Sequence, residues 1–119
     1  MPVVEAFSFP VGGEVITPVL TFSTSIGCLV KNELVPVFVD VEPLTYCIDV
    51  SQIEAQITDK TVAILAPNLM GNLCDWPVIR EIADRHGLVV IEDSADTLGA
   101  TINGKGSGFY SDMSITSFY

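Results

Sequence analysis

Leu88-Val89-Val90-Ile91-Glu92-Asp93-Ser94-Ala95-Asp96 is the stretch of sequence that decides the fold. Its first four residues are apolar and three of them are β-branched, a pattern typical of a strand buried on both faces of a parallel sheet. The strand then ends on carboxylates. Ligands of open α/β sheets bind in the crevice beyond the carboxyl ends of the strands, so we expect Asp93 to lie at a functional site.

The carboxylate of Asp93 could hold a cationic group at that site: a metal ion, a substrate amine or a protonated ring nitrogen. Alternatively, it only caps the turn that follows the strand. Asp96 lies three residues further on and could share a metal ion with Asp93, but no third ligand of suitable spacing accompanies the pair. Metal binding is therefore disfavoured.

Strand and helix patterns alternate on the N-terminal side of this stretch. Strands are expected at residues 14–18, 35–41 and 61–66, a helix at 76–86, and shorter helices at about 26–32 and 49–57. This alternation predicts crossover connections and a mainly parallel sheet with helices on both faces, a three-layer αβα architecture of the α/β class. With 119 residues, the chain has room for a single domain or part of one.

Capping residues mark the ends of two of these helices. Asp75 is the candidate N-cap of the helix at 76–86, and Gly87 occupies the position after its last residue, where a left-handed glycine is favoured. Ser23 or Thr24 is a plausible N-cap for the first helix. These signals place the helix boundaries more firmly than the apolar periodicity alone.

The pattern becomes less regular after Asp96. Residues 98–102 could form a short strand, Asn103-Gly104 is a strong hairpin-turn signal, and residues 113–119 are expected to form a last strand. A globular protein rarely stops on an apolar, aromatic strand. We therefore expect residues 1–119 to be one truncated domain, a fragment of a larger protein.

The composition of the chain is acidic. Fifteen acidic residues against five basic ones give a formal charge of −10, which disfavours nucleic acids and anionic membranes as partners. No apolar run approaches the ~18 residues that span a bilayer, and the N-terminus lacks the basic region of a signal peptide. The three cysteines are widely spaced and fit neither a disulfide framework nor a zinc site, so reduced thiols in a cytoplasmic protein are expected.

Other candidate sites are weak. The sequence contains neither G-x-G-x-x-G after a strand nor G-x-x-x-x-G-K-[ST], so the two common phosphate loops are missing. The glycine-rich run at 104–108 follows a hairpin signal and precedes no helix. His86 is expected to be a solvated residue at a helix end, and Cys74, which has no paired histidine, is expected to be a buried thiol.

Seven segments of the chain match the motifs of one known family, in the same order and at similar spacing. They are residues 13–18 with Thr21-Phe22, then 36–41, 57–61, Gly71-Asn72, 86–88, 91–96 and 114–119. Together they resemble the DegT/DnrJ/StrS sugar aminotransferases and dehydrases, a family of fold-type I enzymes that depend on pyridoxal phosphate. Each segment is weak alone, whereas the whole set in register is specific. The resemblance implies that the chain is part of the large domain of such an enzyme.

The resemblance also implies roles for four residues. The Asp93 carboxylate would pair with the protonated pyridine nitrogen of pyridoxal phosphate or pyridoxamine phosphate and keep the ring an electron sink. Phe22 would stack on the ring, Ser117 would hydrogen-bond the cofactor phosphate, and Asp96 would lie near the phenolic oxygen. Aminotransferases of the family usually carry Gln or His at the position of Asp96. Aspartate there, with Leu98-Gly99, is more similar to the 3-dehydrases, which act on a CDP-linked 4-keto-6-deoxyhexose.

The activity implied is that of a nucleotide-sugar-modifying enzyme of deoxysugar or polysaccharide biosynthesis, with 3-dehydrase and aminotransferase as competing versions. The family's Schiff-base lysine, or the histidine that replaces it in dehydrases, would lie a few residues beyond Tyr119, so the chain is expected to be inactive alone. Family members are homodimers, which implies a homo-oligomer. The alternative is a non-catalytic binding or assembly module on the same scaffold.

Overall fold

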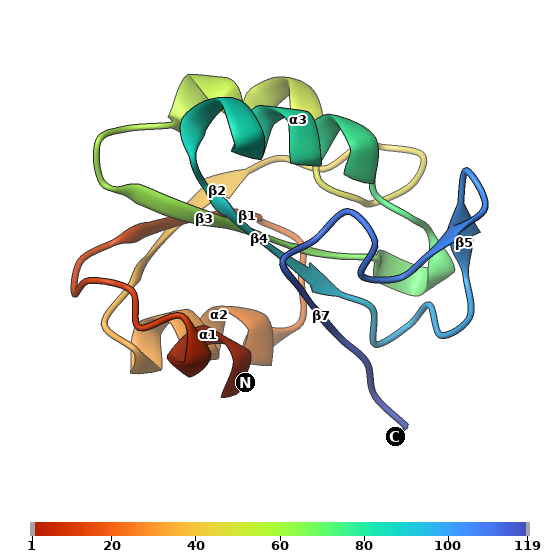
Figure 1. Cartoon of the computed structure of the whole chain (residues 1–119), viewed down its shortest axis with the longest axis horizontal. Helices are drawn as coiled ribbons and strands as arrows, with labels where there is room; N and C mark the ends of the chain where they lie inside the picture. The colour runs from red at the N-terminus through yellow and green to blue at the C-terminus, as the bar shows by residue number, and fades with distance from the viewer. Residues whose placement is uncertain (1, 119) are drawn as a thin grey trace.

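The apolar runs of the sequence form one parallel sheet in the computed structural model, which describes residues 2–118 (Figure 1). The strand order is β2-β1-β3-β4-β7, and each neighbouring pair is parallel. The strands are β1 (Glu14–Pro18), β2 (Val35–Val39), β3 (Thr61–Pro67), β4 (Val89–Asp93) and β7 (Met113–Ile115). The predicted α/β class with a mainly parallel sheet is confirmed.

Helical segments cover both faces of this sheet (Figure 1). One face carries α1 (Pro2–Ala6) and α2 (Ser23–Lys31), and the other carries α3 (Trp76–His86) with the 3₁₀ turns η1 (Val50–Gln52) and η2 (Glu54–Gln56). Successive strand residues point to opposite faces, so Val90 packs in the core under α3 while Ile91 packs in the core over α1 and α2. The three-layer prediction is confirmed.

Helix α3 begins and ends where the sequence predicts. The Asp75 side chain accepts a hydrogen bond from the backbone N–H of Val78, and Gly87 adopts the left-handed conformation (φ 65°) that terminates the helix. The buried face of the helix consists of Trp76, Ile79, Ile82 and Ala83. This amphipathic helix anchors the layer above β3 and β4.

The other helical predictions need correction. Residues 49–57 form η1 and η2 instead of one α-helix, and the Asp49 side chain accepts from the Ser51 N–H at the start of η1. Helix α2 has Phe22 as its N-cap, without a side-chain cap, so the prediction of Ser23 or Thr24 as N-cap was wrong. Helix α1 was not predicted.

The C-terminal strands are shorter than predicted. Strand β7 ends at Ile115 because its partner β4 ends opposite it at Asp93, and Phe118 is 89% exposed; Tyr119 lies outside the described residues. The predicted strand at 98–102 shrinks to β5 (Thr101–Ile102), which pairs antiparallel with β6 (Lys105–Gly106). The turn between them is Asn103-Gly104 with positive φ at both residues, as the hairpin signal predicted.

No helix within residues 2–118 is long and apolar enough to span a bilayer.

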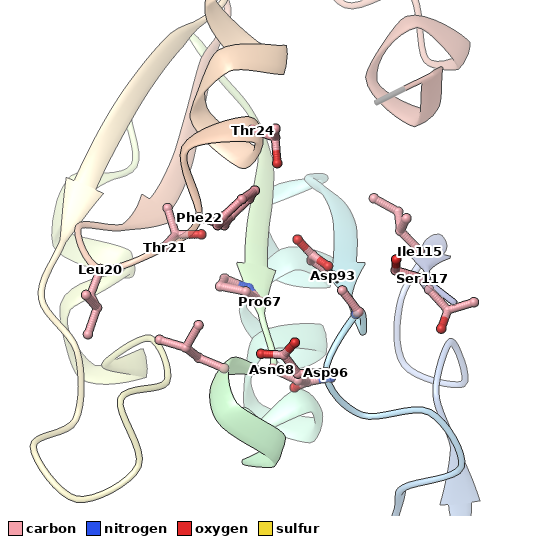
Figure 2. A pocket seen from close by; sticks show the side chains of 13 residues that line it. Leu20, Thr21, Phe22, Thr24, Pro67, Asn68, Asp93, Asp96, Ile115 and Ser117 are labelled. Carbon is pink, nitrogen blue, oxygen red and sulfur yellow. Dashed lines mark hydrogen bonds between the residues drawn. The ribbon is translucent and has the colours of Figure 1, made fainter. Parts of the chain in front are cut away.

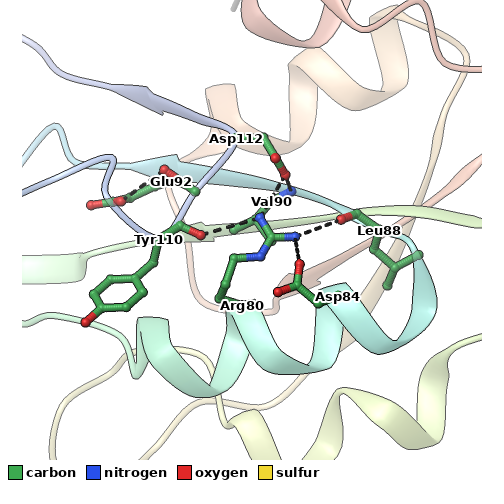
Figure 3. A network of polar contacts seen from close by, with 8 residues as sticks. Arg80, Asp84, Leu88, Val90, Glu92, Tyr110 and Asp112 are labelled. Atoms are coloured by element: carbon green, nitrogen blue, oxygen red, sulfur yellow. Dashed lines mark hydrogen bonds and ion pairs between the residues drawn. The ribbon is translucent and has the colours of Figure 1, made fainter.

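A polar network fastens the segment before β7 to α3 and β4 (Figure 3). The Arg80 guanidinium on α3 contacts the Asp112 carboxylate at 3.0 Å and the Asp84 carboxylate at 2.8 Å, and it donates to the Leu88 carbonyl at 3.4 Å. Asp112 in turn accepts from the backbone N–H of Val90 at 2.7 Å. Arg80 therefore holds β7 in place against β4, and its side chain is only 22% exposed.

We predict that Arg80→Ala lowers the free energy of unfolding by about 1–3 kcal/mol, because it removes a largely buried guanidinium that bonds Asp112 and the Leu88 carbonyl. Urea denaturation followed by circular dichroism measures the change. The control is Arg85→Ala, which removes exposed ion pairs to Glu54 and Glu81 and should cost less than about 1 kcal/mol. Equal losses of unfolding free energy for the two variants would contradict the conclusion that Arg80 holds β7 in place against β4.

Candidate active site

A pocket of about 510 Å³ lies at the carboxyl ends of the parallel strands (Figure 2). Its walls come from the loops after β1, β3, β4 and β7. The lining residues are Leu20, Thr21, Phe22, Thr24, Pro67, Asn68, Leu69, Asp93, Ala95, Asp96, Ile115, Thr116 and Ser117. All four residues singled out by the family resemblance, Phe22, Asp93, Asp96 and Ser117, line this one pocket.

Asp93 is the last residue of β4, and its carboxylate faces the pocket (Figure 2). The Ser25 hydroxyl donates to Oδ2 at 3.2 Å and the backbone N–H of Ala95 donates to Oδ1 at 3.2 Å. Asp93 is only 8% exposed, and among the described residues no cationic side chain forms an ion pair with it. A nearly buried carboxylate without a counter-charge is costly, so its surroundings fit a cationic group of a ligand.

Phe22 forms another wall of the pocket. It is the N-cap residue of α2, and 70% of the residue is exposed. Figure 2 shows its ring and the Asp93 carboxylate on opposite walls of the same space. An exposed aromatic face opposite a carboxylate suits a flat, cationic heteroaromatic ring.

Asp96 joins the loop after β4 to the loop after β3. Its Oδ2 accepts from the backbone N–H of Met70 at 3.1 Å, within the 3₁₀ turn η3 (Leu69–Gly71). Met70 has a left-handed backbone (φ 55°), which is unusual for a residue other than glycine. Asp96 therefore has a structural partner in addition to its place on the pocket wall.

A buried polar network that was not predicted lies behind the pocket. Asn68 is 1% exposed; its side-chain N–H₂ donates to Glu92 and Ser94, and its carbonyl accepts from the Cys74 N–H and the Trp76 indole. Glu92 is 2% exposed and accepts hydrogen bonds from four groups: Asn68 Nδ2, Ser94 Oγ, Gly108 N and Ser111 Oγ. The available signal in the sequence was a polar residue near the end of each of two apolar runs, Asn68 after residues 61–67 and Glu92 after residues 88–91.

The weaker candidates do not join the pocket. His86 Nε2 lies 3.0 Å from a carboxylate oxygen of Glu54, so it forms a surface pair and is not simply solvated.

Cys74 is buried, as predicted, and its hydrogen bond with Cys47 together with burial raises the pKa of its thiol. The same contact lowers the pKa of Cys47 to about 7. No group of three His, Cys, Asp or Glu side chains within residues 2–118 could hold a metal ion.

Comparison with known proteins identifies the family. The sequence model described as the DegT/DnrJ/EryC1/StrS aminotransferase family matches residues 3–119. The chain belongs to this family. The resemblance inferred from the sequence motifs is thereby confirmed, and so is the type of fold.

Relatives in the family differ in their functions. The chain is 45% identical to a pleiotropic regulatory protein of Geobacillus stearothermophilus over 91% of its own length and 29% of that protein. It is 44% identical to a GDP-perosamine synthase of Caulobacter vibrioides, again over 91% and 29%. The chain thus spans less than a third of the length of these curated relatives.

A solved structure in the family contains a cofactor. The Escherichia coli GDP-4-keto-6-deoxy-D-mannose-3-dehydratase with bound hydrated PLP is 33% identical, with a TM-score of 0.80 over 87% of this chain and 26% of the other. This structural likeness supports the fold described here. In this fold the pocket lies beyond the carboxyl ends of the strands.

We predict that Asn68→Asp lowers the free energy of unfolding by about 3–5 kcal/mol, because it places a second buried carboxylate next to Glu92 and removes two donors. Chemical denaturation measures the loss. Asn103→Asp is the matched control, since Asn103 is exposed in a turn that aspartate also tolerates. A small effect at Asn68, equal to that at Asn103, would show that the network does not stabilise the fold.

Proposed function

We propose that this chain provides the cofactor-binding wall of an enzyme that modifies a nucleotide-linked sugar with pyridoxal phosphate or pyridoxamine phosphate. The observation that carries the proposal is the nearly buried carboxylate of Asp93, which faces the pocket without a cationic partner among residues 2–118. When bound, this cofactor supplies an electron sink for a carbanion formed on the substrate.

The role proposed for Asp93 is to keep the pyridine nitrogen of the cofactor protonated. A charge pair at about 4 Å in an effective dielectric of about 20 is worth roughly 4 kcal/mol, or about three units in the pKa of the ring nitrogen. An asparagine would supply no such charge. The loss of neighbouring water on closing the pocket would strengthen the pairing further.

The other wall residues would position the same ring. Phe22 would stack on its face, a contact worth about 0.5–1.5 kcal/mol. Ser117, in the loop after β7, would hydrogen-bond the phosphate, and Asp96 would lie near the phenolic oxygen while Oδ2 holds the Met70 N–H. The hydroxyl of Thr21 is buried in the pocket wall without a hydrogen-bond partner among the described residues.

The substrate class proposed is a nucleotide-linked keto-deoxysugar, with 3-dehydrase and aminotransferase as the two versions. Asp96 with Leu98-Gly99 favours the dehydrase version. One relative is a dTDP-4-dehydro-2,6-dideoxy-D-glucose 3-dehydratase of Saccharopolyspora spinosa, and others are aminotransferases, so both versions occur among proteins similar to this chain. Residues 1–119 are proposed to belong to one large domain, and a second copy of the chain is proposed as its partner.

We predict that the 119-residue chain binds pyridoxamine phosphate and that Asp93→Asn weakens the binding by up to about a thousandfold, because the charge partner of the ring nitrogen is removed. Isothermal titration calorimetry measures the affinity. Asp59→Asn is the matched control, since Asp59 is exposed in a turn away from the pocket. No binding by the unaltered chain, or equal binding by the Asp93 variant, would refute the proposal.

We further predict that no lysine of this chain holds pyridoxal phosphate covalently in the pocket. Lys31, Lys60 and Lys105 do not line it. Borohydride reduction followed by peptide mass spectrometry should therefore show only scattered substoichiometric labelling of lysines. One fully labelled lysine, protected by pyridoxamine phosphate, would overturn this expectation and assign an attachment residue within the chain.

A further inference from the structure

Ser25 is a buried hydroxyl directly behind the pocket wall. It is 1% exposed, and its Oγ donates to Oδ2 of Asp93 at 3.2 Å. Its backbone N–H donates to the carbonyl of Phe22 at 3.0 Å, so the first turn of α2 fixes its position. Ser25 does not itself line the pocket. Its hydroxyl therefore acts on whatever occupies the pocket only through the carboxylate of Asp93.

The two oxygens of Asp93 are held from two sides. The Ala95 N–H bonds Oδ1 and the Ser25 hydroxyl bonds Oδ2, each with one hydrogen bond. The last torsion of an aspartate side chain is otherwise broad, so a carboxylate with a single donor would sample a range of orientations. With both donors present, the plane of the carboxylate is fixed and each oxygen keeps acceptor capacity for a ligand.

We propose that Ser25 is a positioning residue for the cofactor: it orients Asp93 so that the carboxylate meets the protonated pyridine nitrogen in the productive geometry. This inference rests on the function proposed above. Charge-assisted hydrogen bonds depend on alignment, and groups held in advance by their neighbours bind without the entropic cost of ordering.

The first turn of α2 carries both Phe22 and Ser25. Phe22 begins the turn and Ser25 completes it, so the stacking ring and the hydroxyl that orients Asp93 belong to one rigid unit. The helix is anchored in the core by Leu29, which is fully buried, and by Cys28. The spacing between the ring face and the carboxylate is therefore set by the docking of α2 on the sheet.

A purely structural role for Ser25 predicts a different result from a positioning role. If Ser25 only satisfied a buried polar group, its removal would weaken every ligand of the pocket alike. If it orients Asp93 toward a ring nitrogen, its removal would weaken only ligands that carry this nitrogen. The comparison needs a ligand pair that differs in the one atom.

The test uses pyridoxamine phosphate and its deaza analogue, in which carbon replaces the ring nitrogen. Pyridoxamine phosphate has no aldehyde and so cannot form imines with surface lysines. We expect Ser25→Ala to weaken pyridoxamine phosphate about tenfold, the loss typical of one hydrogen bond, and to leave the affinity for the deaza analogue unchanged. Ser25→Thr, which keeps the hydroxyl, should restore most of the affinity.

Two controls complete the design. Ser23→Ala changes an exposed serine in the same turn, outside the pocket wall, and should bind both ligands like the unaltered chain. In an Asp93→Asn background, Ser25→Ala should have no further effect, because the residue through which it acts is changed. If Ser25→Ala does not fold, Ser25→Cys takes its place, since a thiol is a weak donor of similar shape.

The possible outcomes separate the two proposals. Failure of the unaltered chain to bind pyridoxamine phosphate, or indifference to Asp93→Asn, would refute the proposed function and this inference with it. Normal binding that depends on Asp93 but not on Ser25 would overturn the inference alone. An equal loss for pyridoxamine phosphate and the deaza analogue would also overturn it, since this is the result of a structural role.

Discussion

Strand β4 ends on two adjacent carboxylates, and the pleat of the strand sends them to opposite faces of the sheet. Glu92 points to the side of α3, where four donors satisfy it. Asp93 points to the side of α2 and the pocket, where it has two. A slip of one residue in the pairing of β4 would exchange these environments. The register of β4 against β3, Ala63 opposite Val89 through Pro67 opposite Asp93, therefore fixes both the fold and the site.

The two carboxylates also differ in what they do to stability. Glu92 bonds to the loops after β3 and β4 and to the segment at 108–111, so its burial organises the back of the pocket. Asp93 lacks a counter-charge among the described residues, and a carboxylate in such a place costs stability until a cation arrives. Such a cost is tolerated where the group serves binding, and a ligand that relieves it stabilises the folded chain by mass action.

The sequence predicts the layered architecture well because apolar runs and capping residues are local signals. Asp75 and Gly87 correctly predicted the ends of α3, and the buried apolar runs predicted the strands. Residues 49–57 were wrongly predicted to be one α-helix because 3₁₀ turns and a short α-helix bury the same apolar residues. Asp93 was predicted from its place at the carboxyl end of a buried strand, whereas Phe22, Ser117 and the cofactor role of Asp96 came from family resemblance. Ser25 and Asn68 were missed because their partners lie 68 and 24 residues away, and no local pattern shows such pairs.

Asp96 supports the loop after β3 and also lines the pocket. One of its oxygens holds the N–H of Met70, whose left-handed backbone carries a cost of roughly 1–3 kcal/mol that its surroundings must offset. An aspartate is short enough to accept the hydrogen bond from Met70 and still line the pocket. A longer side chain, such as Gln or His, would place different atoms at both points. Aspartate at position 96 therefore couples the shape of the loop after β3 to the group that the pocket presents to a ligand.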